Sequence, residues 1–574
     1  MATELISLGV IFLCAIVGGI IAARFKQPAV FGLLLVGALI GPSSLNLVRD
    51  ANMIRWGAEI GAILMLFVIG LEFDVSKLMK VGARSVLIGL LKFAIVLFFG
   101  YETALLLGFS TKVALFAGVI LSFSSTVVVV KVLEQKEMFS RKEVPLLIAI
   151  LIIEDILAVF VLTFFSGVKD SSTGFISIFE HVIFSVAILI FAYMIIMKML
   201  RYVVNAIMKN NSDESVLAFL SLSIGTLFSY FAYYLGLTPS AGAFLAGSLI
   251  ASLPNAKEYG RAIHPFAMIF TAIFFISMGT LVDFKSVQSN ALLITTLIIA
   301  LIISMFIAVG LLTYLVANFK DEQPFFASLA MIPIGEFSLL IAKESQKFDV
   351  GVDLVTITAS IIFITAIIMS FGINYSEKLH SALSQKVPLR ARLKFERLSG
   401  YMRKFFDQIE IENFFTKKLK SESKIVFMLM VLVMFASLLL RKISLLVGAR
   451  FGTVALYAFY VLSAMIVIYL LNALYKRLRE VHYTLSVILT HVDSSRNLKK
   501  CSAMLNNLLL ALAMFFSAML FPFAIFAFNL AVWANLIPFV LIVASFYWMK
   551  RLVSLMNGAS FSPSYSASFA AAKL

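Results

Sequence analysis

Two adjacent carboxylates, Glu154 and Asp155, lie in the middle of the apolar segment ILIIEDILAVF. No charged residue occurs from Val144 to Ile153 or from Ile156 to Val168. A helix of about 25 residues is about 37 Å long, which is enough to cross a bilayer. A charge at the centre of a bilayer costs about 2.5–3.5 kcal/mol on insertion scales, so this pair indicates a functional site.

A carboxylate removed from water binds a proton more readily, and its oxygens also suit a small hard cation. Proton and cation then compete for the same oxygens. If only the occupied site crosses the membrane, the result is exchange of one for the other. We predict that Asp155 is the shared ligand and that Glu154 is a second ligand, a proton reservoir or the partner of a cation. The two acids would titrate as a coupled pair if they interact strongly.

Hydroxyl groups in the segment LSFSSTVVVVKVL, residues 121–133, can complete such a site. Ser124, Ser125 and Thr126 cluster there before a β-branched run that disfavours helix. A local unwinding would free backbone carbonyls here. We predict that Asp155 and Ser125 are ligands of Na+ or K+. The alternative is that these hydroxyls bond back to their own helix or assist packing.

A second interruption lies in MIPIGEFSLLIA, residues 331–342. Pro333 and Gly335 break the apolar run, and Glu336 and Ser338 lie beside the break. We expect these four residues to support the broken helix, with Glu336 either capping it or pairing with a buried base. Two interrupted helices, one in each half of a protein, are typical of inverted-repeat transporters, in which the broken helices meet at the bilayer midplane.

The composition defines the environment that must position these residues. The chain of 574 residues is 61% hydrophobic and 14% charged, with a mean hydropathy of +1.02, which indicates an integral membrane protein. The net charge of +16 resides in short loops between apolar runs, so it favours a membrane over nucleic acid as the partner. Cys14 and Cys501 lie within apolar segments, and we expect neither a metal site of cysteines nor a cofactor.

The hydropathy pattern predicts thirteen spans before residue 380, the fifth and the twelfth of them broken. Lys and Arg are enriched in alternate loops, which puts the N-terminus outside and residue 377 inside. The predicted spans are 4–23, 29–45, 56–73, 85–107, 112–133, 144–166, 176–200, 214–236, 238–253, 264–282, 290–318, 323–345 and 353–376.

We therefore predict an all-α polytopic membrane protein, with a thirteen-helix inverted-repeat core in residues 1–376 and two crossing broken helices. Residues 377–424 form a basic amphipathic cytoplasmic linker, either a helix on the inner leaflet or a solvated connection. Residues 425–549 hold about four extra spans. Residues 550–574 form a Ser- and Ala-rich disordered tail, and the C-terminus is cytoplasmic.

The chain resembles the monovalent cation:proton antiporter-2 family over residues 5–376. The resemblance implies a homodimer in which a moving core slides against a dimerisation domain, with Asp155 as the essential ligand of cation and proton. It also implies a role in pH homeostasis, and we expect a prokaryotic plasma membrane. The matching pieces are AEIGAILMLFVIGLEFD (58–74), LSFSSTVVVVKVLEQKEM (121–138), IIEDILAV (152–159), TPSAGAFLAGSLIA (238–251), FFISMGTLVDF (274–284) and GEFSLLIA (335–342).

Two departures from the family pattern concern charge. The acidic pair is Glu-Asp, where sodium-transporting relatives often have Asp-Asp and glutathione-gated potassium efflux relatives have Gln-Asp. Electrogenic relatives carry a Lys in the eleventh span that pairs with the first acid, but here the segment LIIALIISMFIAVGLLTYLV holds Val309 near that position and no Lys or Arg. We therefore expect Glu154 to be protonated or to pair elsewhere.

The function that these observations favour is exchange of Na+ or K+ for H+ by a secondary active transporter, which is not an enzyme. The alternatives are a cation channel, an organic-anion symporter, or a membrane sensor built on an antiporter scaffold. Residues 425–549 replace the cytoplasmic nucleotide-binding domain that is usual in the family, and they are a candidate surface for an additional partner.

Overall fold

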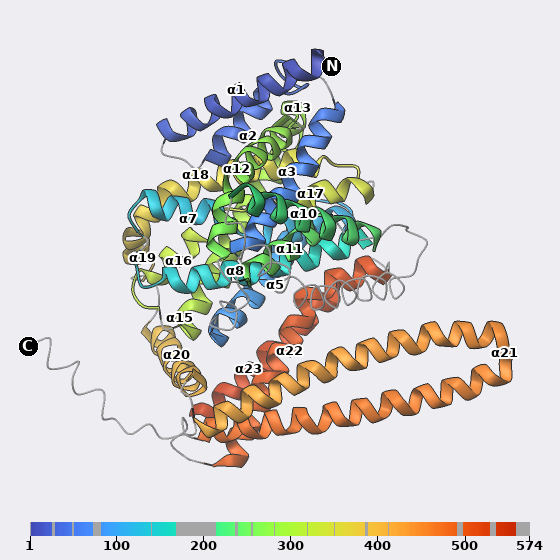
Figure 1. Cartoon of the computed structure of the whole chain (residues 1–574). Coiled ribbons are helices and arrows are strands. Elements are labelled where there is room, and N and C mark those ends of the chain that lie inside the picture. The colour runs from blue at the N-terminus through green and yellow to red at the C-terminus, as the bar shows by residue number, and fades with distance from the viewer. Residues whose placement is uncertain are drawn as a thin grey trace, which may run out of the picture. The chain divides into compact units, whose positions relative to one another are not determined.

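The computed structural model is almost entirely helical in the residues that it describes (Figure 1). One isolated antiparallel β-bridge, between Ser124 and Ile334, is its only strand pairing in that part of the chain. The structure describes residues 2–25, 29–48, 51–72, 82–138, 140–167, 214–235, 239–253, 256–280, 282–317, 319–348, 350–384, 389–410, 413–490, 497–528 and 535–557.

The chain divides into two compact units. The first comprises Met1–Val387 with Pro522–Val532, and the second comprises Pro388–Phe521 with Trp533–Leu574. Nine helices in the described residues are long and apolar enough to cross a membrane. The protein is therefore an integral membrane protein of helical type.

Six helices of the first unit pack mainly with one another, and we call them the scaffold bundle. Small residues permit their close contact: a Cβ on Gly18 would lie 2.7 Å from the carbonyl oxygen of Gly32, and one on Gly247 would collide with the carbonyl oxygen of Phe67. The six helices are α1 (Ala2–Arg24), α2 (Ala29–Ile40), α3 (Ala51–Glu72), α10 (Glu214–Tyr234), α11 (Pro239–Ala251) and α12 (Ala256–Thr280).

The other helices of this unit that occupy predicted spans form a second group, the core bundle. It contains a π-helical segment, η1 (Phe306–Leu311), between two α-helical parts of one span. Its α-helices are α5 (Ala83–Leu106), α6 (Thr111–Leu121), α7 (Thr126–Gln135), α8 (Val144–Gly167), α14 (Ala291–Met305), α15 (Leu312–Val316), α16 (Gln323–Ala330), α17 (Glu336–Ser345) and α18 (Leu354–Gly372).

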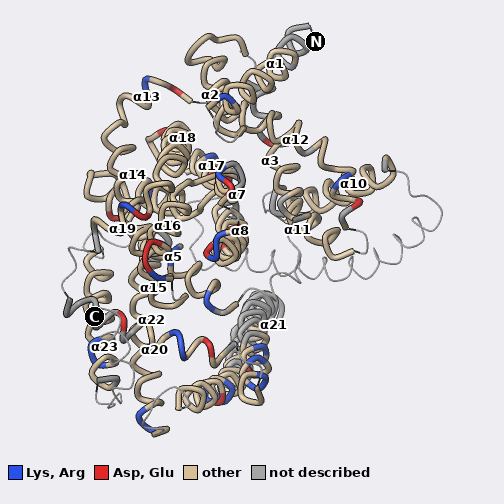
Figure 2. The backbone as a smooth tube through the Cα atoms, turned by 90° about the vertical axis from the view of Figure 1, so that its left-hand side faces the viewer, with Lys and Arg blue, Asp and Glu red and all other residues tan. Residues whose placement is uncertain are grey.

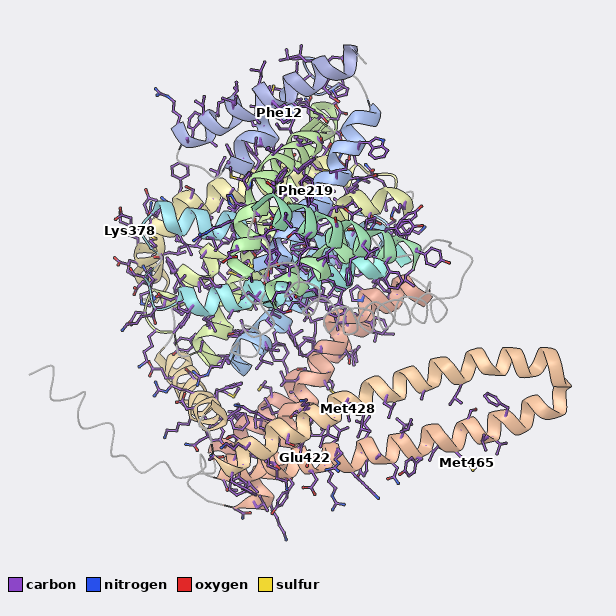
Figure 3. The ribbon with its side chains drawn as sticks, viewed as in Figure 1. Phe12, Phe219, Lys378, Glu422, Met428 and Met465 are labelled. Carbon is purple, nitrogen blue, oxygen red and sulfur yellow. The ribbon has the colours of Figure 1, made fainter. Side chains whose placement is uncertain are left out.

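Short elements complete the first unit: α13 (Phe284–Ser289), η2 (Gln346–Phe348), η3 (Ile373–Tyr375) and α19 (Ser376–Ser384). Helices occupy the predicted spans in the described residues, and the predicted seventh span, 176–200, lies outside those residues. Figure 2 shows how few positions along the helices of this unit are charged. Apolar side chains such as Phe12 and Phe219 are exposed, as expected for surfaces that face lipid (Figure 3).

Two of the predicted spans are broken into half-helices. The fifth consists of α6 and α7 with residues 122–125 between them, and the twelfth consists of α16 and α17 with residues 331–335 between them. Pro333 has no amide hydrogen to continue a helix. A Cβ on Gly335 would collide with the Cβ atom of Ser125, so the close approach of the two breaks requires glycine there.

The second unit consists of α20 (Leu389–Glu410), α21 (Phe414–Thr490), α22 (Leu498–Phe528) as far as Phe521, and α23 (Ile537–Asn557). Figure 1 shows α21 as two antiparallel arms. Ion pairs join these arms at their base, Lys418 to Glu480 at 3.0 Å and Glu422 to Arg477 at 3.1 Å. A straight helix of 77 residues would be about 115 Å long, so these pairs require the reversal.

Apolar side chains of α20 pack inside the second unit. Tyr401, Phe405 and Phe406 are buried, and the hydroxyl of Tyr401 lies 3.9 Å from Sδ of Met504 on α22. This face of α20, within the predicted linker 377–424, therefore contacts protein. Of the predicted tail, residues 558–574 lie outside the described residues.

Candidate ion-binding site

The two helix breaks lie directly against each other. Besides the β-bridge between Ser124 and Ile334, the amide of Ser125 donates to the carbonyl oxygen of Pro333 at 2.7 Å. The Ser124 hydroxyl donates to the carbonyl oxygen of Met331 at 2.6 Å. Backbone groups that an unbroken helix would pair internally are thus satisfied by the other break, which a membrane interior requires.

Side chains also join the two breaks. The hydroxyl of Ser338, on α17, donates to the carbonyl oxygen of Ile120 near the end of α6 at 2.7 Å. The hydroxyl of Ser125 donates to Oε2 of Glu336 at 3.1 Å. Glu336 is the first residue of α17, where the helix dipole favours a negative charge. Helices α7 and α17 begin at the crossing, whereas α6 and α16 end there.

Asp155 faces the beginning of α7. Its side chain is 6% exposed, and the hydroxyl of Thr126, the first residue of α7, lies 3.2 Å from Oδ1 and 3.1 Å from Oδ2. The Thr126 hydroxyl has one hydrogen and two lone pairs. It can donate to an ionised carboxylate or turn a lone pair toward a cation held by that carboxylate.

Glu154 has a very different environment, because a buried lysine pairs with it. Nζ of Lys92, on α5, lies 2.8 Å from Oε2 of Glu154, and the two side chains are 0% and 1% exposed. The same ammonium donates to the Ser124 hydroxyl and to the carbonyl oxygen of Ser122, each at 2.9 Å. The amide of Ser124 also donates to Oε2 of Glu154 at 2.9 Å. All three hydrogens of the ammonium thus have acceptors.

The other carboxylate oxygen of Glu154, Oε1, is buried, and no hydrogen-bond partner for it lies in the described residues. It is therefore an oxygen that a bound ion can use. The site as a whole presents carboxylate, hydroxyl and carbonyl oxygens, which are the ligands that hard cations prefer.

Lys92 is the residue that sequence reasoning missed. We expected Glu154 to be protonated or paired elsewhere than in the eleventh span, and the structure pairs it with a lysine of α5, which occupies the fourth predicted span. The signal was present, because Lys92 is alone in the apolar run VLIGLLKFAIVLFFG, residues 86–100. Val309 is buried within the π-helical segment η1, which contacts α5.

The structure brings the predicted site residues together at one crossing. Asp155 contacts the hydroxyl of Thr126, Glu154 accepts from the amide of Ser124, and Glu336 accepts from the hydroxyl of Ser125, so each acid meets a residue in or directly after the first break. Pro333, Gly335 and Ser338 form the second break and the start of α17 beside it.

The fold of the chain has a counterpart among solved structures. It is similar to the structure of a sodium proton antiporter from Methanocaldococcus jannaschii, with a TM-score of 0.51 and 15% identity, over 66% of this chain and 98% of that one. At that identity the likeness establishes the fold alone, that of a helical membrane antiporter. Residues 10–375 match the model of the sodium/hydrogen exchanger transmembrane family, and the chain belongs to this family.

Curated relatives agree with that assignment and confirm the resemblance to cation:proton antiporters. The chain is 28% identical over 339 residues to the Na(+)/H(+) antiporter of Enterococcus hirae, covering 59% of this chain and 88% of that protein. It is 28% identical over 346 residues to K(+) efflux antiporter 5 of Arabidopsis thaliana, covering 59% of this chain and 61% of that protein. Residues beyond 375 lie outside the family match.

Proposed function

We propose that the protein exchanges Na+ or K+ for H+ across a membrane, with Asp155 as the ligand that cation and proton share. The observation that carries this proposal is the position of Asp155, buried on α8 against the first residue of α7 at the crossing of two broken helices. Relatives of the chain are Na+/H+ and K+ efflux antiporters, which supports the same activity.

Exchange follows from the cost of an uncompensated charge. With neither proton nor cation, Asp155 would carry its charge through an apolar region, which is costly. A proton or a monovalent cation removes that charge, so only the loaded site crosses readily. Ser125 and Thr126 supply oxygens for the cation, and Glu336, Pro333, Gly335 and Ser338 hold the crossing in place.

Alternating access is proposed to be a sliding of the core bundle against the scaffold bundle. The candidate ligands lie on α7, on α8 and in the break between α6 and α7, all within the core bundle, and the helices within each bundle pack mainly with one another. Movement of the core as one body would therefore carry the site without rebuilding it. We further infer a homodimer in a prokaryotic plasma membrane, with the N-terminus outside, and an additional partner through residues 425–549.

The test is cation-driven pH change in proteoliposomes, with Na+, K+ and Li+ supplied separately. We expect Na+ or K+ to dissipate a preset pH gradient, and Asp155→Asn to lose at least about a hundredfold in rate, because Asn cannot carry the proton. The control is Asp321→Asn, the same chemical change at an exposed loop residue whose φ of 51° asparagine tolerates.

Asp155→Asn exchanging at the rate of the natural protein would contradict the assignment of Asp155. Cation flux without proton movement would instead indicate a channel, and the absence of both fluxes from a monodisperse, inserted protein would indicate a sensor.

A further inference from the structure

The two arms of α21 meet at a base that is rich in basic residues. Residues 417–424 of the first arm contain four basic side chains and one acidic side chain, and residues 476–480 of the second arm contain three basic and one acidic. Both acids, Glu422 and Glu480, are engaged by the ion pairs that join the arms. The base therefore keeps an excess of positive charge.

Four of the other basic side chains form a group that we call the basic collar. All four are exposed, and no ion pair within the described residues involves any of them. Their like charges repel one another across the two arms, so an anion bound between them would stabilise the base. The basic collar consists of Lys417, Lys424, Lys476 and Arg479.

Beyond the base, both arms of α21 are apolar and exposed. No charged residue occurs in residues 425–440 or in residues 451–475. Met428 on the first arm and Met465 on the second are 63% and 57% exposed, and Figure 3 shows Met465 far along its arm from Glu422 at the base. At about 1.5 Å per residue the two runs are about 24 and 37 Å long, the scale of the hydrocarbon core of a bilayer. The arms therefore present a surface suited to acyl chains.

The basic collar lies where this apolar surface ends. The ion pair between Glu422 and Arg477 sets the register of the two antiparallel arms. Two residues toward the apolar part of each arm, Lys424 therefore lies level with Tyr475, whose side chain is 66% exposed. Tyrosine and long basic side chains are typical of the headgroup level of a membrane, because their apolar parts stay in hydrocarbon while their polar ends reach water. Charge and apolar surface thus change at the same level on both arms.

We propose that the basic collar binds the headgroups of anionic phospholipids while the apolar arms contact their acyl chains. Ammonium and guanidinium groups donate charge-assisted hydrogen bonds to phosphate oxygens. Because the collar directly adjoins the apolar surface, its partner must combine negative charge with hydrocarbon, as such a lipid does. The inference concerns the second unit alone and does not depend on the proposed exchange.

The test measures lipid binding by the purified full-length protein in detergent. Dioleoyl phosphatidylglycerol and dioleoyl phosphatidylcholine share their acyl chains and differ in net charge, and native mass spectrometry counts each bound lipid. We expect phosphatidylglycerol to bind at least about tenfold more tightly, because each basic side chain at a membrane surface adds to the attraction for an anionic lipid. The preference should shrink at high salt, which screens exposed charges. Equal affinities for the two lipids would overturn the proposal.

The collar variant localises the binding. We expect its preference for phosphatidylglycerol to fall to about threefold or less, because it lacks the four positive charges of the collar. A collar variant that is monodisperse and keeps the full preference would overturn the proposal. It combines Lys417→Gln, Lys424→Gln, Lys476→Gln and Arg479→Gln.

The control variant makes the same change in net charge at four exposed lysines of the first unit. We expect it to keep the preference of the natural protein. Equal losses in the control and collar variants would overturn the proposal, because they would show a response to net charge alone. The control combines Lys112→Gln, Lys142→Gln, Lys285→Gln and Lys320→Gln.

Two paired variants keep the test decisive if the collar variant does not fold. Lys417→Gln with Lys424→Gln changes the first arm only, and Lys476→Gln with Arg479→Gln changes the second arm only. We expect each pair to lower the preference by about threefold or more, because both arms supply charges to the collar. Full preference in either monodisperse pair would overturn the proposal.

Soluble anions separate the lipid from other partners of a positive surface. Inorganic phosphate or polyglutamate is added to the natural protein with phosphatidylglycerol bound, at the same concentration of negative charge. We expect neither to displace the lipid, because neither contacts the apolar arms. Displacement by phosphate would assign the collar to a soluble phosphate and displacement by polyglutamate to an acidic polypeptide, and either result would overturn the proposal.

Discussion

At the scale of single residues, two adjacent acids on one helix have acquired different environments. Glu154 is fixed by an ammonium and a backbone amide, whereas Asp155 faces the rotatable hydroxyl of Thr126. Neighbours on a helix point about 100° apart, so α8 directs one acid toward α5 and the other toward α7. The first acid therefore lies in a buried ion pair, whereas the second contacts a hydroxyl at the start of a broken helix, where we propose that it binds the exchanged ion.

Substitutions of Thr126 test whether its hydroxyl is a ligand of the cation. We expect Thr126→Val to raise the cation concentration for half-maximal exchange by about tenfold or more, because a hydrogen bond to a charged group contributes about 1.5–3 kcal/mol. Thr126→Ser, which keeps the oxygen, is the control and should stay within about threefold of the natural protein. Equal affinities for the Val and Ser variants, measured by titration in proteoliposomes, would assign Thr126 to packing.

At the scale of elements, the crossing of the two broken helices depends on the close approach of their backbones at Gly335. The two breaks are bonded through the Ser124–Ile334 bridge and the Ser125–Pro333 hydrogen bond, which span more than two hundred residues of sequence. These contacts replace the internal hydrogen bonds that each broken helix lacks. The breaks therefore stabilise each other, because either break alone would leave backbone groups without hydrogen-bond partners.

A substitution of Gly335 tests whether the crossing depends on this close approach. We expect Gly335→Ala to destabilise the protein by about 1–3 kcal/mol and to abolish most exchange, because the added methyl group collides with Ser125 and separates the breaks. The control is Gly260→Ala in α12, where no atom of the described residues, apart from the neighbouring turns of the helix itself, lies within 4 Å of the new methyl group. That change should leave activity intact and stability unchanged or slightly higher. Thermal unfolding in detergent and exchange in proteoliposomes measure both effects, and equal melting temperatures for the two variants would refute the argument.

At the scale of the whole molecule, the family match ends at residue 375 and the long first segment of the first unit ends at Val387, whereas the second unit has its own buried residues. Tyr401, Phe405, Leu489, Met504 and Leu552 line a small cavity of about 20 Å³ between α20 and the later helices of that unit. Helix α20 thus belongs, by its packing, with the helices that follow it.

Two truncations test this division. A chain ending at Ser384 should insert and retain measurable exchange, because it keeps both bundles and the crossing. A chain ending at Lys420 should aggregate more, because α20 would then expose Tyr401, Phe405 and Phe406 without their covering helices. Size exclusion and exchange assays on the two chains measure the difference. Complete loss of exchange in an inserted chain ending at Ser384 would show that the later helices take part in transport.

Much of the site was predictable from the sequence because the necessary signals are local. The apolar runs, the acids Glu154 and Asp155 within one of them, and the interruptions at residues 122–125 and Pro333 are each visible in a short window. Hydropathy, missing amide hydrogens and the cost of a charge in an apolar segment act on the chain wherever it folds.

The tertiary structure decided which of these local features meet. The lysine that pairs with Glu154 lies 62 residues earlier on another helix, and the hydroxyl of Ser124 reaches a carbonyl 207 residues later. Such partners depend on how helices pack and which faces they turn toward each other, and one sequence window does not contain that information. The sequence alone therefore predicted a buried acid pair beside a broken helix, and packing determined that Lys92 pairs with Glu154 and that Thr126 contacts Asp155.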